Sequence, residues 1–340
     1  MWRTAVQKSS IRHATFPLWK LLAVLVILLM PLSACTEKPQ APLRISAVLW
    51  PGYEPLFIAK KLGYFDPHPI QLVDYLSNTD AMLAFRNNKL EAGAFTFDEV
   101  ISLVSEGEDI QIILILDVSR GGDVILATPN INSVRELKNK RVAVEQSAVG
   151  GLVLAKALAL NDMDYSDITI VAISPMEQES EFNNKTIDAA VSFDPYRTHL
   201  LKNGIKEIFS SREMPNEIID VLAVRTDYLK RNPEAIHTLT HAWFKALNFQ
   251  QEHPRKSAQL SINRFNTNVD DYLSGLSLLH FPNIEENQAL LTPSTSHLIA
   301  TSQSLFPIME KIGSLTKTID IEPHLNNSFI NSAQKPSTNE

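Results

Sequence analysis

The sequence predicts an α/β protein made of two successive lobes and a helical C-terminal region. Strand-like and helix-like segments alternate from residue 43 to residue 116, and the alternation starts again after residue 123. Such alternation is typical of a mainly parallel sheet with helices on its faces. Beyond Asp227 the helical periods continue and the strand signal almost ends. A length of 340 residues fits two domains.

The first lobe is expected to contain four strands. The run QIILIL at 111–116 is apolar throughout, as expected of a strand that is buried on both faces. The first helix has proline in its first turn, and the next two follow short polar side chains that can cap a first turn. In chain order we expect strand 43–50, helix 55–62, strand 70–76, helix 81–90, strand 92–97, helix 99–106 and strand 111–116.

The second lobe is expected to span residues 124–224. Reversals of the chain near 117–123 and near 220–225 are predicted to be the two crossovers between the lobes. In chain order we expect strand 124–127, helix 133–140, strand 141–144, helix 150–160, strand 168–173, helix 177–183, strand 189–193, helix 196–202, and strands 206–209 and 218–224.

The C-terminal region 225–315 is expected to be helical and to pack on residues 44–123, completing the first lobe. The polar stretch 326–340 is predicted to be disordered. Ligands of open α/β sheets bind beyond the carboxyl ends of the strands. Two such lobes are therefore expected to face each other across a cleft.

Residues 1–34 have the features of an export signal. Four cationic residues and no acid precede the apolar run 21–30, which is about half the length that a membrane span needs. The run leads to Leu32-Ser33-Ala34-Cys35, which resembles the bacterial lipobox. That resemblance implies lipidation at Cys35, a polar linker over 35–43, and a folded part on the periplasmic face of a membrane. An ordinary signal peptide with an incidental cysteine is the alternative.

Composition argues against several classes of function. A hydrophobic fraction of 44% and a charged fraction of 20% are globular values. The net charge of −7 argues against a nucleic-acid partner. With one cysteine, a disulfide framework and a multi-cysteine metal site are excluded, and no cofactor or metal is expected. His237 and His241 have metal-ligand spacing, but a surface or core pair is favoured because no glutamate follows His237.

Four ordered blocks resemble the solute-binding proteins of ABC importers, in the branch that takes nitrate, sulfonates, taurine and thiamine-pyrimidine precursors. They are WPGYEPLFIA with GYF at 50–65, AFTFD at 94–98, SVRELKNKRVAV at 133–144 and IDAAVSFDPY at 187–196. The resemblance covers roughly residues 44–250. It implies a two-lobed periplasmic-binding-protein fold of type II, a monomer, a small-molecule solute, and a permease and ATPase as partners.

Four aromatic residues at strand ends are candidates for the ligand site. Trp50 and Tyr53 can form an apolar wall for a planar or methylene-bearing ligand, with a core role as the alternative for both. Phe97 and Phe193 end strands in the two lobes and are predicted to oppose each other across the cleft. Core packing is the commoner role of such phenylalanines and is the favoured alternative for both.

Five polar or basic residues complete the uncharged and cationic part of the predicted site. Asn78, Thr79 and Ser147 stand at helix starts, where backbone N–H groups can hold an anion and where capping alone explains the residue type. Ser119 and Arg120 lie in the first crossover. Arg120 is the only base near a predicted cleft loop and would pair with a carboxylate or sulfonate, unless it forms an ion pair at the hinge surface.

Acids outnumber bases near the predicted cleft. Glu54, Asp98, Glu145, Asp194 and Asp220 fall near strand ends, and Asp194 and Asp220 are included in the predicted site. Some of these acids have a structural role, such as a helix cap or a turn. Five acids against one base favour a zwitterion or a heterocycle over a pure anion such as nitrate.

The sequence therefore predicts capture of a small polar solute by hinge closure, followed by delivery to an ABC importer. A binding protein that signals to a membrane receptor would have the same sequence features. An enzyme acting in the cleft is a third reading. It is disfavoured because no G-x-S-x-G, Walker or G-x-G-x-x-G motif is present.

Overall fold

The computed structural model describes Met1 and residues 42–145 and 149–330. Cys35, Ser147, the predicted signal and nearly all of the linker therefore lie outside the described residues, as does the stretch 331–340. Among the described residues, no helix has the length and apolarity that a membrane span requires.

The first sheet has six strands in the order β11-β4-β10-β3-β1-β2. Strands β2, β1 and β3 are parallel, whereas β10 is antiparallel to both of its neighbours. Only one residue of β4 is not buried, as its apolar run predicts. The strands are β1 (Leu43–Ala47), β2 (Ile70–Asp74), β3 (Ala92–Thr96), β4 (Ile110–Ser119), β10 (Ile219–Arg225) and β11 (Leu279–His280).

The second sheet has five strands in the order β7-β6-β8-β5-β9. Here β7, β6 and β8 are parallel and β5 is antiparallel to both neighbours, so the order repeats that of β2-β1-β3-β10-β4. This confirms the predicted α/β class. The strands are β5 (Val124–Ala127), β6 (Arg141–Val144), β7 (Thr169–Ala172), β8 (Ala189–Ser192) and β9 (Lys206–Ser210).

Strand β10 corrects the predicted boundary of the second lobe. Residues 219–224 pair with β3 and β4 in the first sheet, so they do not belong to the second lobe as predicted. An apolar run shows that a strand is buried, but it does not show which sheet receives it. The return crossover is therefore the segment 211–218, which precedes β10.

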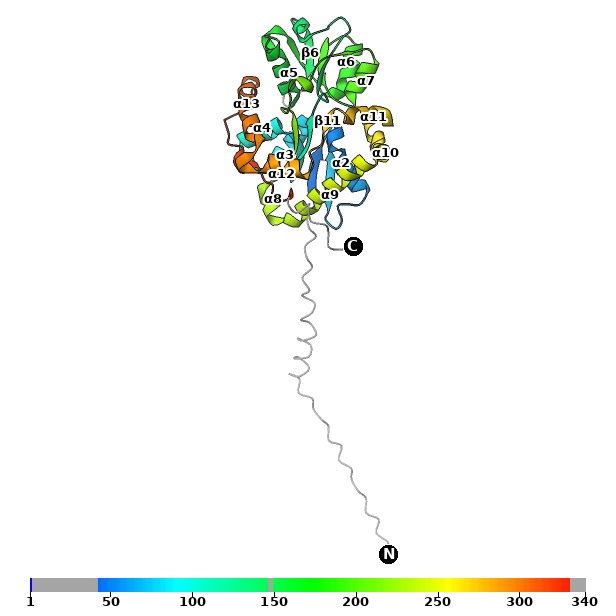
Figure 1. Cartoon of the computed structure of the whole chain (residues 1–340), viewed down its shortest axis with the longest axis vertical. Helices are drawn as coiled ribbons and strands as arrows, with labels where there is room; N and C mark the ends of the chain where they lie inside the picture. Colours follow the sequence, from blue (N-terminus) through cyan, green and yellow to red (C-terminus); the bar gives the residue numbers. More distant parts are fainter. Residues whose placement is uncertain (2–41, 146–148, 331–340) are drawn as a thin grey trace. The chain divides into compact units, whose positions relative to one another are not determined.

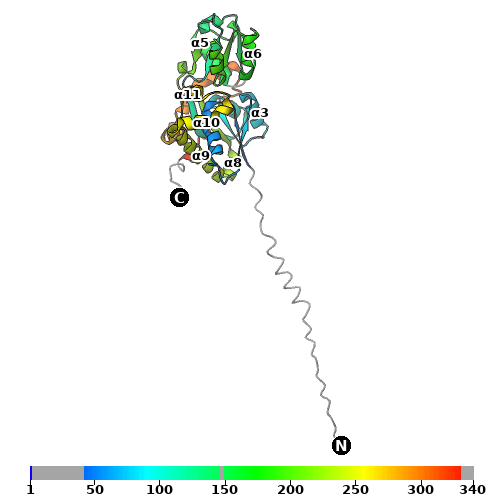
Figure 2. The same cartoon turned by 90° about the vertical axis from the view of Figure 1, so that its right-hand side faces the viewer.

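Helices from both ends of the chain cover the first sheet (Figure 1). Helix α9 packs on α2, α12 packs on β4, and α13 contacts both α4 and the second-lobe helix α5. Helices α5, α6 and α7 lie beside the second sheet in Figure 1, and Figure 2 shows the same for α5 and α6. The helices are α2 (Glu54–Lys61), α3 (Asn78–Arg86), α4 (Phe97–Glu106), α5 (Val149–Leu160), α6 (Gln178–Asn183), α7 (Tyr196–Lys202), α8 (Thr226–Arg231), α9 (Pro233–Glu252), α10 (Pro254–Phe265), α11 (Val269–Leu276), α12 (Ile284–Leu291) and α13 (His297–Ile312).

The described C-terminal residues are part of the fold. The Asn326 N–H donates to the Ile112 carbonyl at 3.0 Å, and Phe329 and Ile330 are buried. The prediction of disorder from residue 326 is therefore wrong for 326–330. Because the residues on both sides of this pair are polar, the sequence did not indicate that the two apolar side chains belong to the core.

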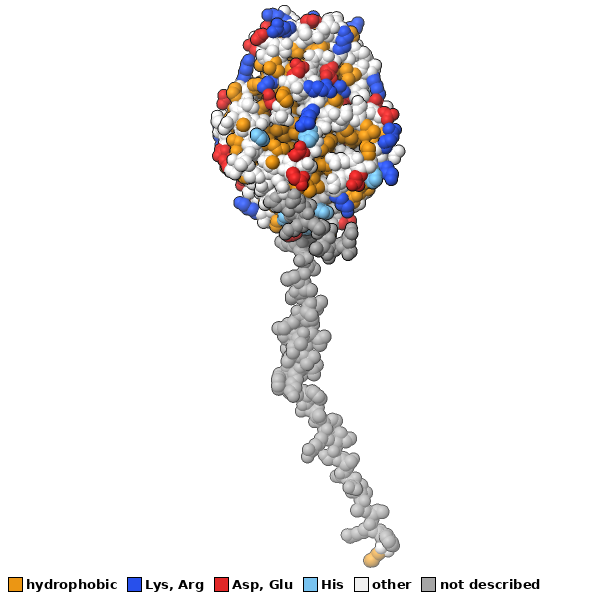
Figure 3. Space-filling model, in the orientation of Figure 1, with side chains coloured by type: hydrophobic (Ala, Val, Ile, Leu, Met, Phe, Trp, Pro, Cys, Tyr) orange, Lys and Arg blue, Asp and Glu red, His pale blue; other side chains and the backbone are white. Residues whose placement is uncertain are grey.

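The outer surface has no concentration of one charge on the face shown in Figure 3. Acidic and basic side chains are interspersed there. A group of buried acidic side chains lies inside the protein, where the two lobes meet.

Candidate ligand-binding site

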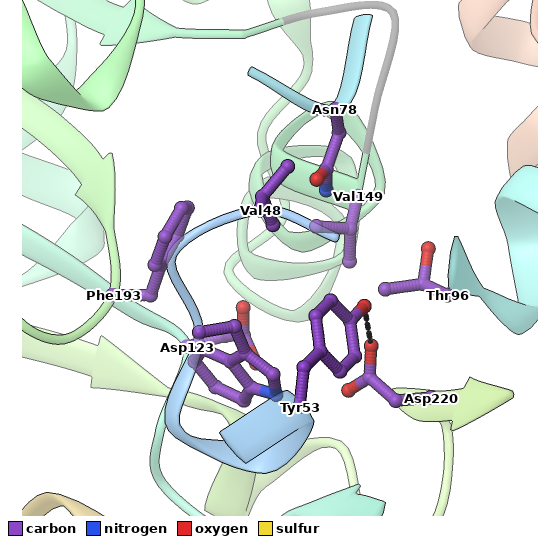
Figure 4. Close-up of a pocket in the computed structure, with 9 residues that line it drawn as sticks. Val48, Tyr53, Asn78, Thr96, Asp123, Val149, Phe193 and Asp220 are labelled. Atoms are coloured by element: carbon purple, nitrogen blue, oxygen red, sulfur yellow. Dashed lines mark hydrogen bonds between the residues drawn. The ribbon is translucent and has the colours of Figure 1, made fainter. Parts of the chain in front are cut away.

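A buried cavity of about 20 Å³ lies between the two lobes (Figure 4). This volume holds about one water molecule, so the two lobes are closed on each other. The first lobe contributes most of the lining, the second lobe contributes two side chains, and the first crossover contributes Asp123. The lining residues are Val48, Trp50, Tyr53, Asn78, Thr96, Asp123, Val149, Phe193 and Asp220.

The turn after β1 places two aromatic rings in the cavity wall. Trp50 precedes a short 3₁₀ turn, η2 (Pro51–Tyr53), and its Nε1–H donates to Asp117 Oδ2 at 3.1 Å. The Tyr53 hydroxyl donates to Asp220 Oδ1 at 2.5 Å. Gly52 is required between them, because a Cβ there would lie 1.8 Å from Asp117 Oδ2. The rings therefore wall the cavity while their polar edges contact buried acids.

Phe193 brings the second lobe to the same wall. It directly follows β8, and its ring centroid lies 5.7 Å from that of Trp50 in an edge-to-face arrangement. Phe193 and Trp50 come from different lobes. This contact therefore depends on the closed arrangement of the lobes.

Five carboxyl groups are buried around the cavity: Asp98, Glu99, Asp117, Asp123 and Asp220. Burial raises the pKa of Asp123 to about 6. Burial also raises the pKa values of Asp98, Glu99, Asp117 and Asp220. Repulsion from a neighbouring acid adds to this for three of them: Asp98 acts on Glu99, Asp123 on Asp117, and Asp117 on Asp220. The common cause is loss of water around the charged form. These buried carboxyl groups therefore bind protons more tightly than exposed carboxyl groups do.

Two carboxylates join the lobes at helix starts. The Thr79 N–H and hydroxyl, at the start of α3, donate to Glu145 Oε1 of the second lobe at 2.8 and 2.5 Å. In the opposite direction, the Val149 N–H at the start of α5 donates to Glu99 Oε1 at 3.4 Å. Helix N-termini attract anions. Here the protein's own acids occupy both of these positions.

The structure brings together five of the residues predicted from sequence. Trp50, Tyr53, Asn78, Phe193 and Asp220 all line the cavity. Thr79 lies beside them and holds Glu145, another of the acids that sequence reasoning noted near the cleft.

Three predicted residues lie elsewhere. Phe97, the first residue of α4, is fully buried in the core and is not one of the residues that line the cavity. Arg120 is exposed and lines a different cavity of about 290 Å³ beside α12 and α13. Asp194 caps α7 by accepting from the Thr198 N–H at 3.0 Å, and it lines another small cavity.

Ser119 is part of the connection between the lobes and does not line the cavity. Its hydroxyl lies 2.8 Å from that of Ser211, and its N–H donates to the Ile218 carbonyl at 3.0 Å. The Ser211 N–H in turn donates to the Asp123 carbonyl at 2.8 Å. These bonds tie the first crossover to the return crossover.

Four lining residues were absent from the predicted site: Val48, Thr96, Asp123 and Val149. Thr96 could have been predicted from strand alternation. It is the last residue of β3, and since its neighbour Phe97 is in the core, the side chain of Thr96 is expected on the opposite side. Asp123 follows two glycines in the segment predicted to be a crossover. A crossover lies next to the cleft, so this position could have indicated that Asp123 lines the cavity. Val48 and Val149 carry no chemical feature that separates them from core valines.

A model of the NMT1-like family matches residues 36–262. The chain belongs to the NMT1-like family. A putative aliphatic sulfonates-binding protein of Bacillus subtilis is 24% identical to this NMT1-like chain over 289 residues, which are 82% of the chain and 84% of the relative. The family resemblance found in the sequence is therefore confirmed.

Solved structures show the same fold for the NMT1-like chain. The alkanesulfonate-binding protein SsuA of Xanthomonas axonopodis bound to MOPS aligns with a TM-score of 0.72 and 15% identity, covering 86% of this chain and all of that one. The nitrate-binding protein NrtA of Synechocystis gives 0.69 and 13%, with 86% and 88% covered. The desulfurization enzyme DSZB gives 0.64 and 16%, with 86% and 99% covered. The predicted two-lobed binding-protein fold is confirmed, and an enzyme also has this fold.

Proposed function

We propose that the chain is the solute-binding protein of an ABC importer and captures a small polar organic molecule between its lobes without catalysis. The observation that carries this proposal is the cavity, which both lobes and the first crossover line. Aromatic walls with a few buried polar groups are typical of small-molecule sites. Relatives that are named as binding proteins support the same function. A monomer that docks on a permease with its ATPase fits this role.

Hinge motion about the two crossovers would open the cavity. The hydrogen bonds at Ser119 and Ser211 lie at the connection and can persist while the lobes rotate. Opening would break the Thr79–Glu145 contact and the ion pair between Lys202 of α7 and Asp271 of α11. A solute that contacts both lobes adds bonds that only the closed form can make, and so shifts the population toward that form.

Two exposed apolar side chains allow this motion to be measured. Leu76 in the first lobe and Met176 in the second are 72% and 49% exposed, so cysteines for nitroxide labels should be tolerated there in a Cys35→Ser background. Pulsed electron paramagnetic resonance is expected to give two label-to-label distances, one for the open form and a shorter one for the closed form. A solute that raises the melting temperature should increase the population with the shorter distance. Suitable solutes come from a panel of taurine, alkanesulfonates, nitrate, amino-pyrimidines, polyamines and amino acids.

Glu145→Gln is the matched variant for this measurement. It keeps the shape of the side chain and removes the charge from its bonds to Thr79. Such a bond is worth about 1 kcal/mol or more, so the population with the longer distance should grow several-fold. A single distance that no solute in the panel changes would contradict hinge closure.

We also propose that Cys35 is acylated and that the lipid anchors the chain to a membrane. Cys35→Ser is expected to abolish labelling by radioactive palmitate and to move the protein from the membrane fraction to the soluble fraction or to an unprocessed form. Ser33→Ala is the matched control, because alanine is also small and should leave labelling intact. Continued labelling of the Cys35→Ser protein would refute the anchor.

A further inference from the structure

We propose that the solute is a compact organic ammonium ion, held by Asp123 and Asp220 between the rings of Trp50, Tyr53 and Phe193. This inference rests on the solute-binding function proposed above. It narrows the solute from polar organic molecules in general to one charge type.

The cavity offers carboxylates and no counter-charge for an anion. Asp123 and Asp220 line it, and none of the described lining residues is Lys, Arg or His. Arg264 lines a separate cavity of about 220 Å³ between the lobes. Its guanidinium is already paired with Glu54 at 2.6 Å and with Asp74. A positively charged ligand would neutralise the acids, whereas an anionic ligand would add to their repulsion.

One carboxylate oxygen of Asp123 can accept a hydrogen bond from a ligand. Its side chain is 5% exposed, and its Oδ2 has no hydrogen-bond partner among the described residues. Native proteins rarely leave a buried carboxylate oxygen unpaired, because its loss of water is then uncompensated. The oxygen belongs to a residue that lines the cavity. An ammonium N–H in the cavity would supply the missing bond.

The helix starts that could attract a sulfonate or nitrate are occupied. Glu145 accepts from Thr79 at the start of α3, and Glu99 accepts from Val149 at the start of α5. An anionic solute would have to displace both carboxylates in order to use these N–H groups. A cationic solute leaves both cross-lobe contacts in place.

The three rings suit an ammonium group. Trp50 and Phe193 meet edge to face at 5.7 Å, and Tyr53 completes the lining beside Asp220 (Figure 4). Aromatic faces attract cations through their quadrupoles, and aromatic cages recognise substituted ammonium groups in this way. The site therefore offers π faces and acceptor oxygens together. The small volume favours a compact ligand and requires the lobes to part for its entry.

The test uses the full chain, purified in detergent, with titration calorimetry and thermal melts. The cationic probes are methylammonium, ethanolammonium and choline. Propan-1-ol is the matched control because it has the shape of ethanolammonium with a methyl group in place of the charged ammonium group. Ethanesulfonate, taurine and calcium chloride represent the other charge types. We expect at least one ammonium probe to bind, and ethanolammonium to bind at least tenfold more tightly than propan-1-ol.

Two variants locate the binding. Asp123→Asn keeps the side-chain shape and removes its charge, and it should weaken ammonium binding at least tenfold. Asp227→Asn makes the same change at a side chain that is 69% exposed, and it should leave binding unchanged. Phe193→Leu removes a π face on the half-buried second-lobe wall and should weaken ammonium binding several-fold. This variant keeps the test decisive if Asp123→Asn fails to fold.

The other outcomes overturn the inference in distinguishable ways. Equal binding of ethanolammonium and propan-1-ol would show that the charge of the probe does not matter. Binding of ethanesulfonate, taurine or calcium with no response to any ammonium probe would refute the ammonium class. A sulfonate response would still leave the solute-binding function intact. No binding by any probe, together with no response to the wider panel, would overturn the ammonium class and the proposed function together.

Discussion

Replacing Tyr53 by alanine is expected to abolish measurable solute binding and to lower the free energy of unfolding by about 3–5 kcal/mol. The side chain is 2% exposed and packs between the cavity and the first-lobe core. Truncation removes a ring from the cavity wall and takes away the donor that satisfies Asp220. Chemical denaturation measures the stability loss, and the ligand-induced shift of the melting temperature measures binding.

Tyr53→Phe is the matched control that separates the ring from the hydroxyl. It keeps the apolar wall and removes only the hydrogen bond to Asp220. The expected stability cost is about 1–3 kcal/mol, the penalty for an unsatisfied buried polar group, and binding should weaken by about tenfold. Unchanged affinity in Tyr53→Ala would show that the cavity is not the ligand site.

The stability of the ligand-free protein is expected to fall as pH rises from 5 to 8. The pKa of Asp123 is raised to about 6, and the pKa values of Asp117, Glu99 and Asp220 are raised as well. Each raised pKa means that the folded state binds a proton more tightly than the unfolded chain, whose carboxyl pKa is about 4. This contribution to stability is complete below pH 4 and is lost as pH rises through the folded-state pKa.

The melting temperature should therefore be lower at pH 8 than at pH 5, by about 5 °C or more. Asp117→Asn should flatten the slope and raise the melting temperature at pH 8, since the amide oxygen can still accept from Trp50. Asp227→Asn, at an exposed side chain, should leave the slope unchanged. A melting temperature that rises steadily from pH 5 to pH 8 would contradict the prediction.

Local patterns were sufficient to predict most of the elements, because they depend on neighbouring residues. The apolar run 111–116 lies within β4, and Pro55 lies in the first turn of α2. The partner of β10 could not be predicted in the same way. Its neighbours β3 and β4 lie more than 100 positions earlier in the chain, and an apolar strand fits either sheet.

The structure places only part of the predicted residue set around one cavity, because strand ends locate a cleft without fixing side-chain direction. Tyr53 and Asp220 follow that rule and meet at 2.5 Å. Phe97 follows it too, but the start of α4 turns its ring into the core. Arg120 does not line this cavity: its N–H, just after β4, donates to the Leu278 carbonyl in the C-terminal region, and its side chain lines the cavity beside α12 and α13. Ser147 and Cys35 lie outside the described residues, so their roles stay predictions.

The place of β10 has a consequence for synthesis on the ribosome. The chain is made from its N-terminus, so β4 leaves the ribosome about 100 residues before its central neighbour β10, which separates it from β3. The whole second lobe is made in that interval, and its five strands all lie between residues 124 and 210. The lobe made second is thus the one whose sheet can be completed first. Until residue 225 has emerged, β4 is an apolar strand without its main partner, which makes it the segment most in need of protection from aggregation.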